Sequence, residues 1–87
     1  MNMKKPVFSK HATRRAGERG ISEEWAAEAI YSAEETVNVK FGRKASYKKF
    51  GDDHVVVIYE ESVDKITVVT ILKVSKERLE RYGFSRI

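Results

Sequence analysis

The stretch that sets the start of this fold is residues 11–21, which read HATRRAGERGI. Ser9 stands just before it and has the side chain of a helix N-cap, while Gly20 suits the position just past a helix end. These two signals predict an α-helix over residues 10–19. The residues of greatest chemical interest lie on this helix.

Three of those residues recur every four positions. On an α-helix His11, Arg15 and Arg19 lie along one side, separated by about 6 Å of rise per step. Ala12 and Ala16 lie beside them and allow the helix to pack closely. We therefore expect the stripe His11–Arg15–Arg19 to lie at the edge of a buried face. A solvated basic face in a charge-rich protein is the alternative interpretation.

A second helix follows after a short link at Gly20-Ile21, so the two helices form a hairpin or a sharp corner. Ser22 is its predicted N-cap, with Glu23 and Glu24 near the positive end of the helix dipole. Its apolar residues recur at helical spacing: Trp25, Ala26, Ala29, Ile30 and Ala33.

After Glu35 the hydrophobic period changes from helix to strand. Four strands are predicted, over residues 36–41, 44–50, 54–61 and 65–73. Their short connections require antiparallel neighbours. A short helix over residues 75–82, ended by Gly83, completes an α+β fold with two N-terminal helices packed on a four-stranded antiparallel sheet. The segment before Ser9 is either a short edge strand or a disordered arm.

Both faces of this sheet are predicted to be partly apolar, so each needs a cover. Strict alternation places Val56, Ile58, Ile66, Val68 and Leu72 on one face, and Val55, Val57, Tyr59, Val69 and Ile71 on the other. The two N-terminal helices cover one face and the C-terminal helix part of the other. The core is expected to be carried by Trp25, Ile30, Val56, Ile58, Val68 and Leu72.

Composition limits the function. The 87 residues make one domain, residues 1–87, and the absence of cysteine excludes disulfides and thiolate metal sites. No apolar run is long enough to span a bilayer and the start lacks a signal peptide, so a cytoplasmic location is expected. Basic and acidic blocks alternate: residues 1–20 and 40–49 each carry a net charge of +5 within a total of +4. Such patches attract polyanions.

The chain resembles a family of small bacterial and archaeal domains of unknown function. That family shows His-Ala-x-x-Arg-x-x-x-Arg-Gly-Ile near its start, then Gly-Arg-x-x-Tyr, then two strand motifs. The matching segments here run from about residue 8 to residue 73: His11-Ala12, Arg15, Arg19-Gly20-Ile21, Gly42-Arg43, Tyr47, Val57-Ile58-Tyr59-Glu60 and Val68-Val69-Thr70.

That family is similar to the RelE/ParE and BrnT-like toxins, within the metal-independent ribonuclease folds that include barnase and colicin nuclease domains. The resemblance implies two N-terminal helices on a curved antiparallel sheet. It also implies a toxin–antitoxin endoribonuclease that acts on free or ribosome-bound RNA, with an antitoxin protein as partner and no membrane association. The second class of function, a non-catalytic module on the same fold that binds nucleic acid or protein, stays open.

The residues themselves suit metal-independent RNA cleavage, in which the 2′-hydroxyl attacks the adjacent phosphate and no cofactor is needed. His11 carries an imidazole, the side chain most suited to act as a base or acid, and Arg15 and Arg43 suit a phosphate clamp. Tyr47 is the candidate for a further proton donor or phosphate contact. The candidate RNA-binding residues are Arg19, Lys44, Lys48, Lys49 and Thr70. We expect His11, Arg15, Arg19, Arg43 and Tyr47 to converge on one grooved surface.

Each candidate also has a structural interpretation. His11 could hydrogen-bond at the helix–sheet junction, and Arg15 and Arg19 could pair with Glu18 or Glu23. Tyr47 could simply pack on the sheet, Lys48 and Lys49 could guard an edge strand, and Thr70 could serve as a β-branched strand residue. His54 beside Asp52 and Asp53 is too local a group for a metal site.

Overall fold

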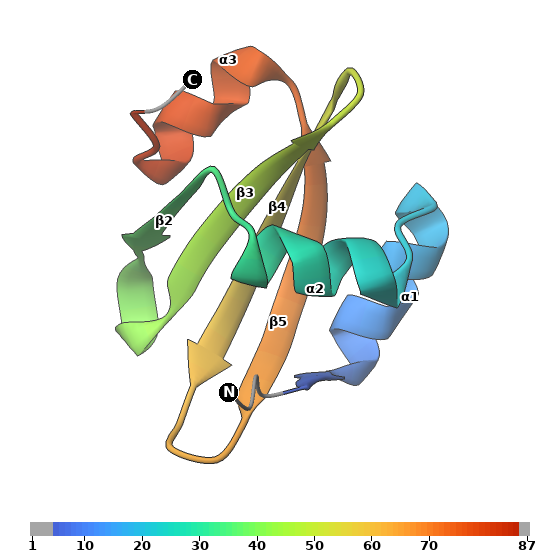
Figure 1. The fold of residues 1–87 in the computed structure, drawn as a ribbon, viewed down its shortest axis with the longest axis vertical. Helices are drawn as coiled ribbons and strands as arrows, with labels where there is room; N and C mark the ends of the chain where they lie inside the picture. Colours follow the sequence, from blue (N-terminus) through green and yellow to red (C-terminus); the bar gives the residue numbers. More distant parts are fainter. Residues whose placement is uncertain (1–4, 86–87) are drawn as a thin grey trace.

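The computed structural model describes residues 5–85, which form one sheet with helices on both faces (Figure 1). The strand order is β1-β5-β4-β3-β2. The strands are β1 (Pro6–Phe8), β2 (Glu35–Asn38), β3 (Lys44–Phe50), β4 (Asp53–Glu61) and β5 (Ile66–Val74). The helices are α1 (Lys10–Arg19), α2 (Glu23–Tyr31) and α3 (Lys76–Leu79), with 3₁₀ turns η1 (Lys40–Gly42) and η2 (Glu80–Tyr82).

The predicted α+β class, with two N-terminal helices and a short C-terminal helix, is confirmed. The four predicted strands are joined by a fifth, β1, which pairs in parallel with β5 and confirms the edge-strand alternative for the segment before Ser9. The other four strands are antiparallel to their neighbours, as predicted. With three residues, β1 is too short to show a period in the sequence. Pro6 fits this place, since an edge strand tolerates a residue without a backbone N–H.

The start of α1 is fixed to the sheet through Ser9. The Ser9 Oγ accepts a hydrogen bond from the Ala12 N–H at 3.0 Å and lies 3.2 Å from the Val69 carbonyl oxygen, to which it donates. The Ser9 N–H also donates to the Val68 carbonyl at 3.1 Å. The helix ends at Gly20, which adopts φ 65°, the left-handed conformation that glycine reaches without strain. The predicted limits of this helix are therefore confirmed.

Each sheet face has its own apolar cluster. The face covered by α1 and α2, here called the helix face, buries twelve residues: Ala12, Ala16, Ile21, Ala26, Ala29, Ile30, Val55, Val57, Tyr59, Ile66, Val68 and Ile71. The opposite face, here called the C-terminal face, buries Ala45, Tyr47, Val56, Val74, Leu79 and Phe84 beneath α3 and η2. Figure 1 shows α2 crossing in front of the sheet and α1 beside β5.

Two core predictions were wrong. Ile66 and Val68 belong to the helix face, because a β-bulge between Ile58 and Tyr59 shifts the register of β4 against β5 and breaks strict alternation. Trp25 is 37% exposed and stacks on Phe50 with ring centroids 4.4 Å apart, so it covers the edge of the core. None of the helices within residues 5–85 has the length and apolar character needed to cross a bilayer.

Candidate nucleic-acid interface

The stripe His11–Arg15–Arg19 lies on α1, with Ala12 and Ala16 buried beside it. His11 is exposed, whereas Arg15 and Arg19 are half-buried. Arg15 Nη1 lies 3.3 Å from Glu18 Oε1 and donates a hydrogen bond to it. The alternative that Arg15 pairs with a neighbouring carboxylate is thus confirmed for Glu18. This pair lies within one turn of α1 and does not involve His11 or Arg19.

The first turn of α1 is unusual in its charge. Lys10 and His11 open the helix, and residues 10–13 contain no acidic side chain. The positive end of the helix dipole usually attracts carboxylates and repels cations. Ser9 supplies the helix cap, so the structural role suggested for His11 at this junction is taken by another residue. A lysine and a histidine therefore stand at the end of α1 where the peptide N–H groups point outward.

Arg43 lies elsewhere, between η1 and β3. Its Nε is 3.8 Å from the Glu60 carboxylate, and its guanidinium carbon is 5.7 Å from the centre of the Phe41 ring. Glu60 follows Ile58 by two residues on β4 and so faces the C-terminal side of the sheet. In Figure 1, η1 and α1 lie at opposite edges of the sheet. Arg43 is therefore separated from the stripe by β3 and β4.

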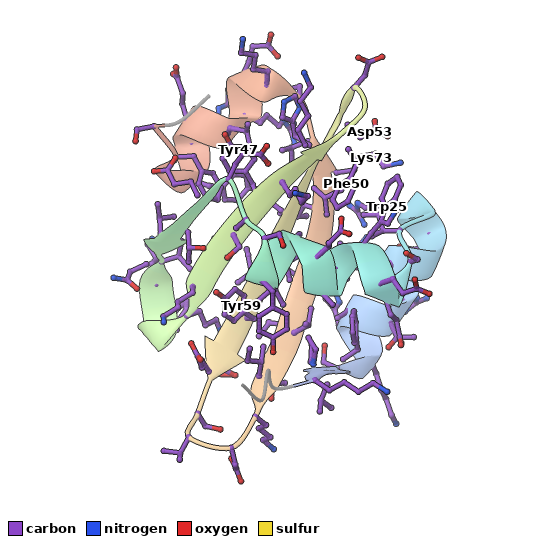
Figure 2. All side chains as sticks on the ribbon, viewed as in Figure 1. Trp25, Tyr47, Phe50, Asp53, Tyr59 and Lys73 are labelled. Atoms are coloured by element: carbon purple, nitrogen blue, oxygen red, sulfur yellow. The ribbon has the colours of Figure 1, made fainter. Side chains whose placement is uncertain are left out.

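Tyr47 is buried on the C-terminal face, with 4% of its surface exposed. Its ring meets Phe84 edge-on with centroids 4.8 Å apart, and its centroid lies 6.4 Å from that of the His54 ring. Figure 2 labels Tyr47 beside α3. The packing interpretation of Tyr47 is confirmed. The predicted convergence of the five residues was wrong, because alternation along β3 directs Tyr47 to the face away from α1.

The remaining candidates are spread over both faces. Lys44 and Lys48 face the helix side, where Lys44 Nζ is 3.1 Å from Glu61 Oε1 and Lys48 Nζ donates to the Ser32 carbonyl at 3.2 Å. Lys49 lies opposite His54, and Thr70 opposite Ile58 on the C-terminal face. Strand β2 pairs only with residues 44–47 of β3, so Lys48 and Lys49 lie where β3 has no strand partner on that side among residues 5–85. The Lys49 N–H donates there to Glu34 Oε2 at 2.9 Å, and the interpretation that the two lysines guard an edge stays open.

One aromatic residue that the sequence reading placed in a strand has a different position. Phe41 lies in η1 with φ 65°, and 84% of its surface is exposed. The sequence signal was an aromatic residue directly before Gly42 and flanked by lysine and arginine, in the segment KFGRK of residues 40–44. A glycine at the end of a strand pattern marks a bend in the backbone, and the predicted strand in fact ends at Asn38.

A chain of hydroxyl groups runs under the end of α2. Ser46 Oγ lies 2.7 Å from Thr36 Oγ1 and 3.2 Å from the Tyr59 hydroxyl. The nearby Tyr31 hydroxyl is buried and has no hydrogen-bond partner among residues 5–85. Burial raises the pKa of Tyr31, and Glu61 and Tyr59 raise it further. Nothing in the sequence pattern marks this cluster, because Thr36 and Ser46 are ordinary residues of two different strands.

The comparisons with known proteins identify a family but no function. Residues 8–73 match the model of a domain of unknown function, DUF4258. The match covers both N-terminal helices and strands β2 to β5 except the last residue of β5. No curated protein and no solved structure gives a significant match.

Proposed function

The chain belongs to the DUF4258 family of domains of unknown function, and we propose that it is a metal-independent endoribonuclease of the toxin–antitoxin type. We place its chemistry on α1 and relate its fold to that of the RelE-like toxins. The observation that carries the proposal is the first turn of α1, where exposed His11 stands beside Lys10 without an acid in residues 10–13. A phosphate there would meet a cation, a helix dipole and an imidazole, a side chain that can accept or donate a proton.

In the proposed reaction, neutral His11 takes the proton of the RNA 2′-hydroxyl. The 2′-oxygen then forms a bond to the adjacent phosphorus, and the bond from phosphorus to the 5′-oxygen breaks. Water supplies the proton for the leaving 5′-oxygen, and the hydroxide that remains takes back the proton held by His11. The products are a 2′,3′-cyclic phosphate and a 5′-hydroxyl. Arg15 and Arg19 stabilise the negative charge that develops on the phosphate oxygens. An antitoxin partner would inhibit the enzyme by covering α1 with an acidic surface.

The test is incubation of the purified protein with RNA in the presence of EDTA. We expect fragments that end in 2′,3′-cyclic phosphate, and we expect RNA with 2′-O-methyl groups to stay intact because it lacks the nucleophile. A His11→Ala protein purified in parallel controls for contaminating ribonucleases. Cleavage of equal rate in both preparations, or cleavage of 2′-O-methyl RNA, would contradict the proposal.

A second candidate function is RNA binding without cleavage. The burial of Tyr47 on the C-terminal face favours it, because the residue expected to act as a proton donor does not reach α1. Binding to 2′-O-methyl RNA that falls steeply with salt, together with intact RNA in the EDTA assay, would support this function over the first. Counterion release from phosphates is the cause of such salt dependence.

A further inference from the structure

The η1 loop carries the most exposed aromatic ring among residues 5–85. Phe41 has 84% of its surface in solvent, while Trp25, the exposed aromatic next in order, has 37%. The backbone of Phe41 has φ 65° and ψ 30°, a left-handed conformation that is an outlier for a bulky side chain. Strained backbone of this kind persists where the surroundings hold it and is concentrated at functional sites.

Basic side chains flank this ring in the sequence, and one of them lies over it. Lys40 precedes Phe41, and the Arg43 guanidinium lies 5.7 Å from the centre of its ring. Residues 40–49 contain five basic side chains and no acid. Arg43 Nε is buried without a hydrogen bond, and its nearest acid, Glu60, is 3.8 Å away. The Arg43 side chain as a whole keeps 34% of its surface in solvent, and this exposed part of the guanidinium could bind a phosphate.

An exposed ring among cations is the combination that binds single-stranded nucleic acid. Unpaired bases stack on aromatic side chains, and basic residues follow the phosphates. We propose that the η1 loop is a second RNA contact, in which one unpaired base stacks on Phe41 and its flanking phosphates bind Lys40 and Arg43. This inference rests on the proposed function for its ligand, RNA, but it does not require that the protein cleave that RNA.

The loop also lies beside a polar hollow of about 440 Å³, lined in part by Gly42, Glu60 and Glu61. Carboxylates accept hydrogen bonds from the amino and imino groups on base edges. A base stacked on Phe41 would thus have acceptors on one side and cations on the other. An acidic protein surface would pair with the cations but has no base to stack on Phe41, so the exposed ring is the observation that favours RNA.

The experiment measures binding of a fluorescent single-stranded 2′-O-methyl RNA, which cannot be cleaved by the proposed route. Phe41→Gly removes the ring and also relieves the backbone strain, because glycine adopts a positive φ freely. We expect its Kd for the single strand to rise about 5- to 100-fold, the size of the loss of one base–aromatic stack. Its Tm should be equal to or above that of the wild type, which excludes unfolding as the cause.

Three comparisons make the result specific. Phe41→Trp should keep the affinity, and Phe41→Leu should lose it, because the flat ring and not apolar area supports stacking. Val63→Ala, in the turn after β4 where Val63 is 96% exposed, should bind as the wild type does. An RNA containing 2-aminopurine should show quenching with the wild type and little with Phe41→Leu. Binding to a duplex should be unchanged in all variants.

Several outcomes would overturn the inference. Wild-type affinity in Phe41→Gly would do so, even where His11-dependent cleavage is observed, and the proposed function would then stand alone. A poly-glutamate chain that binds as tightly as RNA, with equal dependence on Phe41, would identify an acidic protein as the occupant. Failure of the wild type to bind any RNA would overturn both proposals. Ring-dependent binding without cleavage would support the inference and contradict only the nuclease assignment.

Discussion

The two N-terminal helices begin alike but carry opposite charges in their first turns. Each starts at a serine cap, Ser9 for α1 and Ser22 for α2, whose Oγ accepts a backbone hydrogen bond at 3.0 Å. Helix α2 then places Glu23 and Glu24 in its first turn, whereas residues 10–13 of α1 contain no acid. Both helices pack on the same sheet face. Their difference in charge therefore cannot be explained by a difference in what they cover.

The helix dipole explains the charges of α2 and not those of α1. A carboxylate in the first turn stabilises a helix by about 0.3–1 kcal/mol, and a cation there costs a similar amount. Elsewhere in α1 the charges have local explanations. Arg14 and Arg15 both lie within 4 Å of Glu18, and Arg19 is in the last turn, where a cation is favourable. Lys10 and His11 are the basic residues of α1 whose positions neither Glu18 nor the helix dipole explains.

The largest expected effect is on the rate of RNA cleavage, and it compares His11 with Glu24, the second residues of α1 and α2. His11→Ala should lower the rate of RNA cleavage by about 10²- to 10⁴-fold, the usual contribution of a general acid or base. Glu24→Ala, the equivalent change in α2, should leave that rate within a few-fold of the wild type. Cleavage should be measured per folded molecule, with Tm determined on the same samples. If His11→Ala lowers Tm and leaves the rate per folded molecule unchanged, His11 is a structural residue.

A smaller effect is expected when the charges of the first residues are exchanged. Lys10→Glu should raise the Kd for single-stranded RNA about tenfold and reduce the salt slope by about 0.7, the value for one phosphate contact on a single strand. The same change should add about 0.6–2 kcal/mol to the free energy of unfolding, because it removes an unfavourable cation and adds a favourable carboxylate at this end of the helix.

Glu23→Lys is the matched control for that exchange. It should lose stability by a similar amount and should not weaken RNA binding. The measurements are fluorescence anisotropy over a range of salt concentrations and urea denaturation. A comparable loss of RNA affinity in both variants would show that binding does not distinguish α1 from α2.

The helices could be predicted from the sequence because their signals are local. Ser9, Ser22 and Gly20 mark ends within a few residues of the chain, and the limits of α1 were correct. Strand β3 over residues 44–50 was also correct, since its ends are set by Gly42 and Gly51. The α+β class followed from the change of hydrophobic period after Glu35. These features depend on neighbours in the sequence and not on distant contacts.

The site could not be assembled in the same way, because it depends on which face each strand presents. Alternation places Tyr47 and Lys49 on the same side of β3, but the sequence does not say which side. The register against β4 and the cover by α3 show that Tyr47 lies on the sheet face away from α1. The bulge at Ile58 and Tyr59 likewise reversed the expected faces of Ile66 and Val68. A bulge adds one residue to a strand pair, and its position leaves no mark in the hydrophobic pattern. Convergence of distant residues therefore needed the structure.

The smallest expected effect tests the conclusion that α2 serves packing. Tyr31, its last residue, has a buried hydroxyl with no hydrogen-bond partner among residues 5–85. Tyr31→Phe removes that hydroxyl and should raise the free energy of unfolding at pH 7 by about 1 kcal/mol or less. RNA binding should be unchanged. Urea denaturation and anisotropy measure the two quantities, and Tyr82→Phe, on the C-terminal face, controls for the loss of a tyrosine hydroxyl outside this cluster.

The pH dependence of this variant gives a sharper test. Burial first, and then Glu61 and Tyr59, raise the pKa of Tyr31 in the folded protein above its ordinary value of 10.0. Above about pH 10 the unfolded chain loses this proton while the folded chain keeps it, so the wild type loses stability as pH rises. Phenylalanine has no such proton, and the stability gap between Tyr31→Phe and the wild type should widen above pH 10. Curves that stay parallel from pH 8 to 11 would show that the Tyr31 hydroxyl ionises as easily in the folded protein as in the unfolded chain, and that α2 does not bury it.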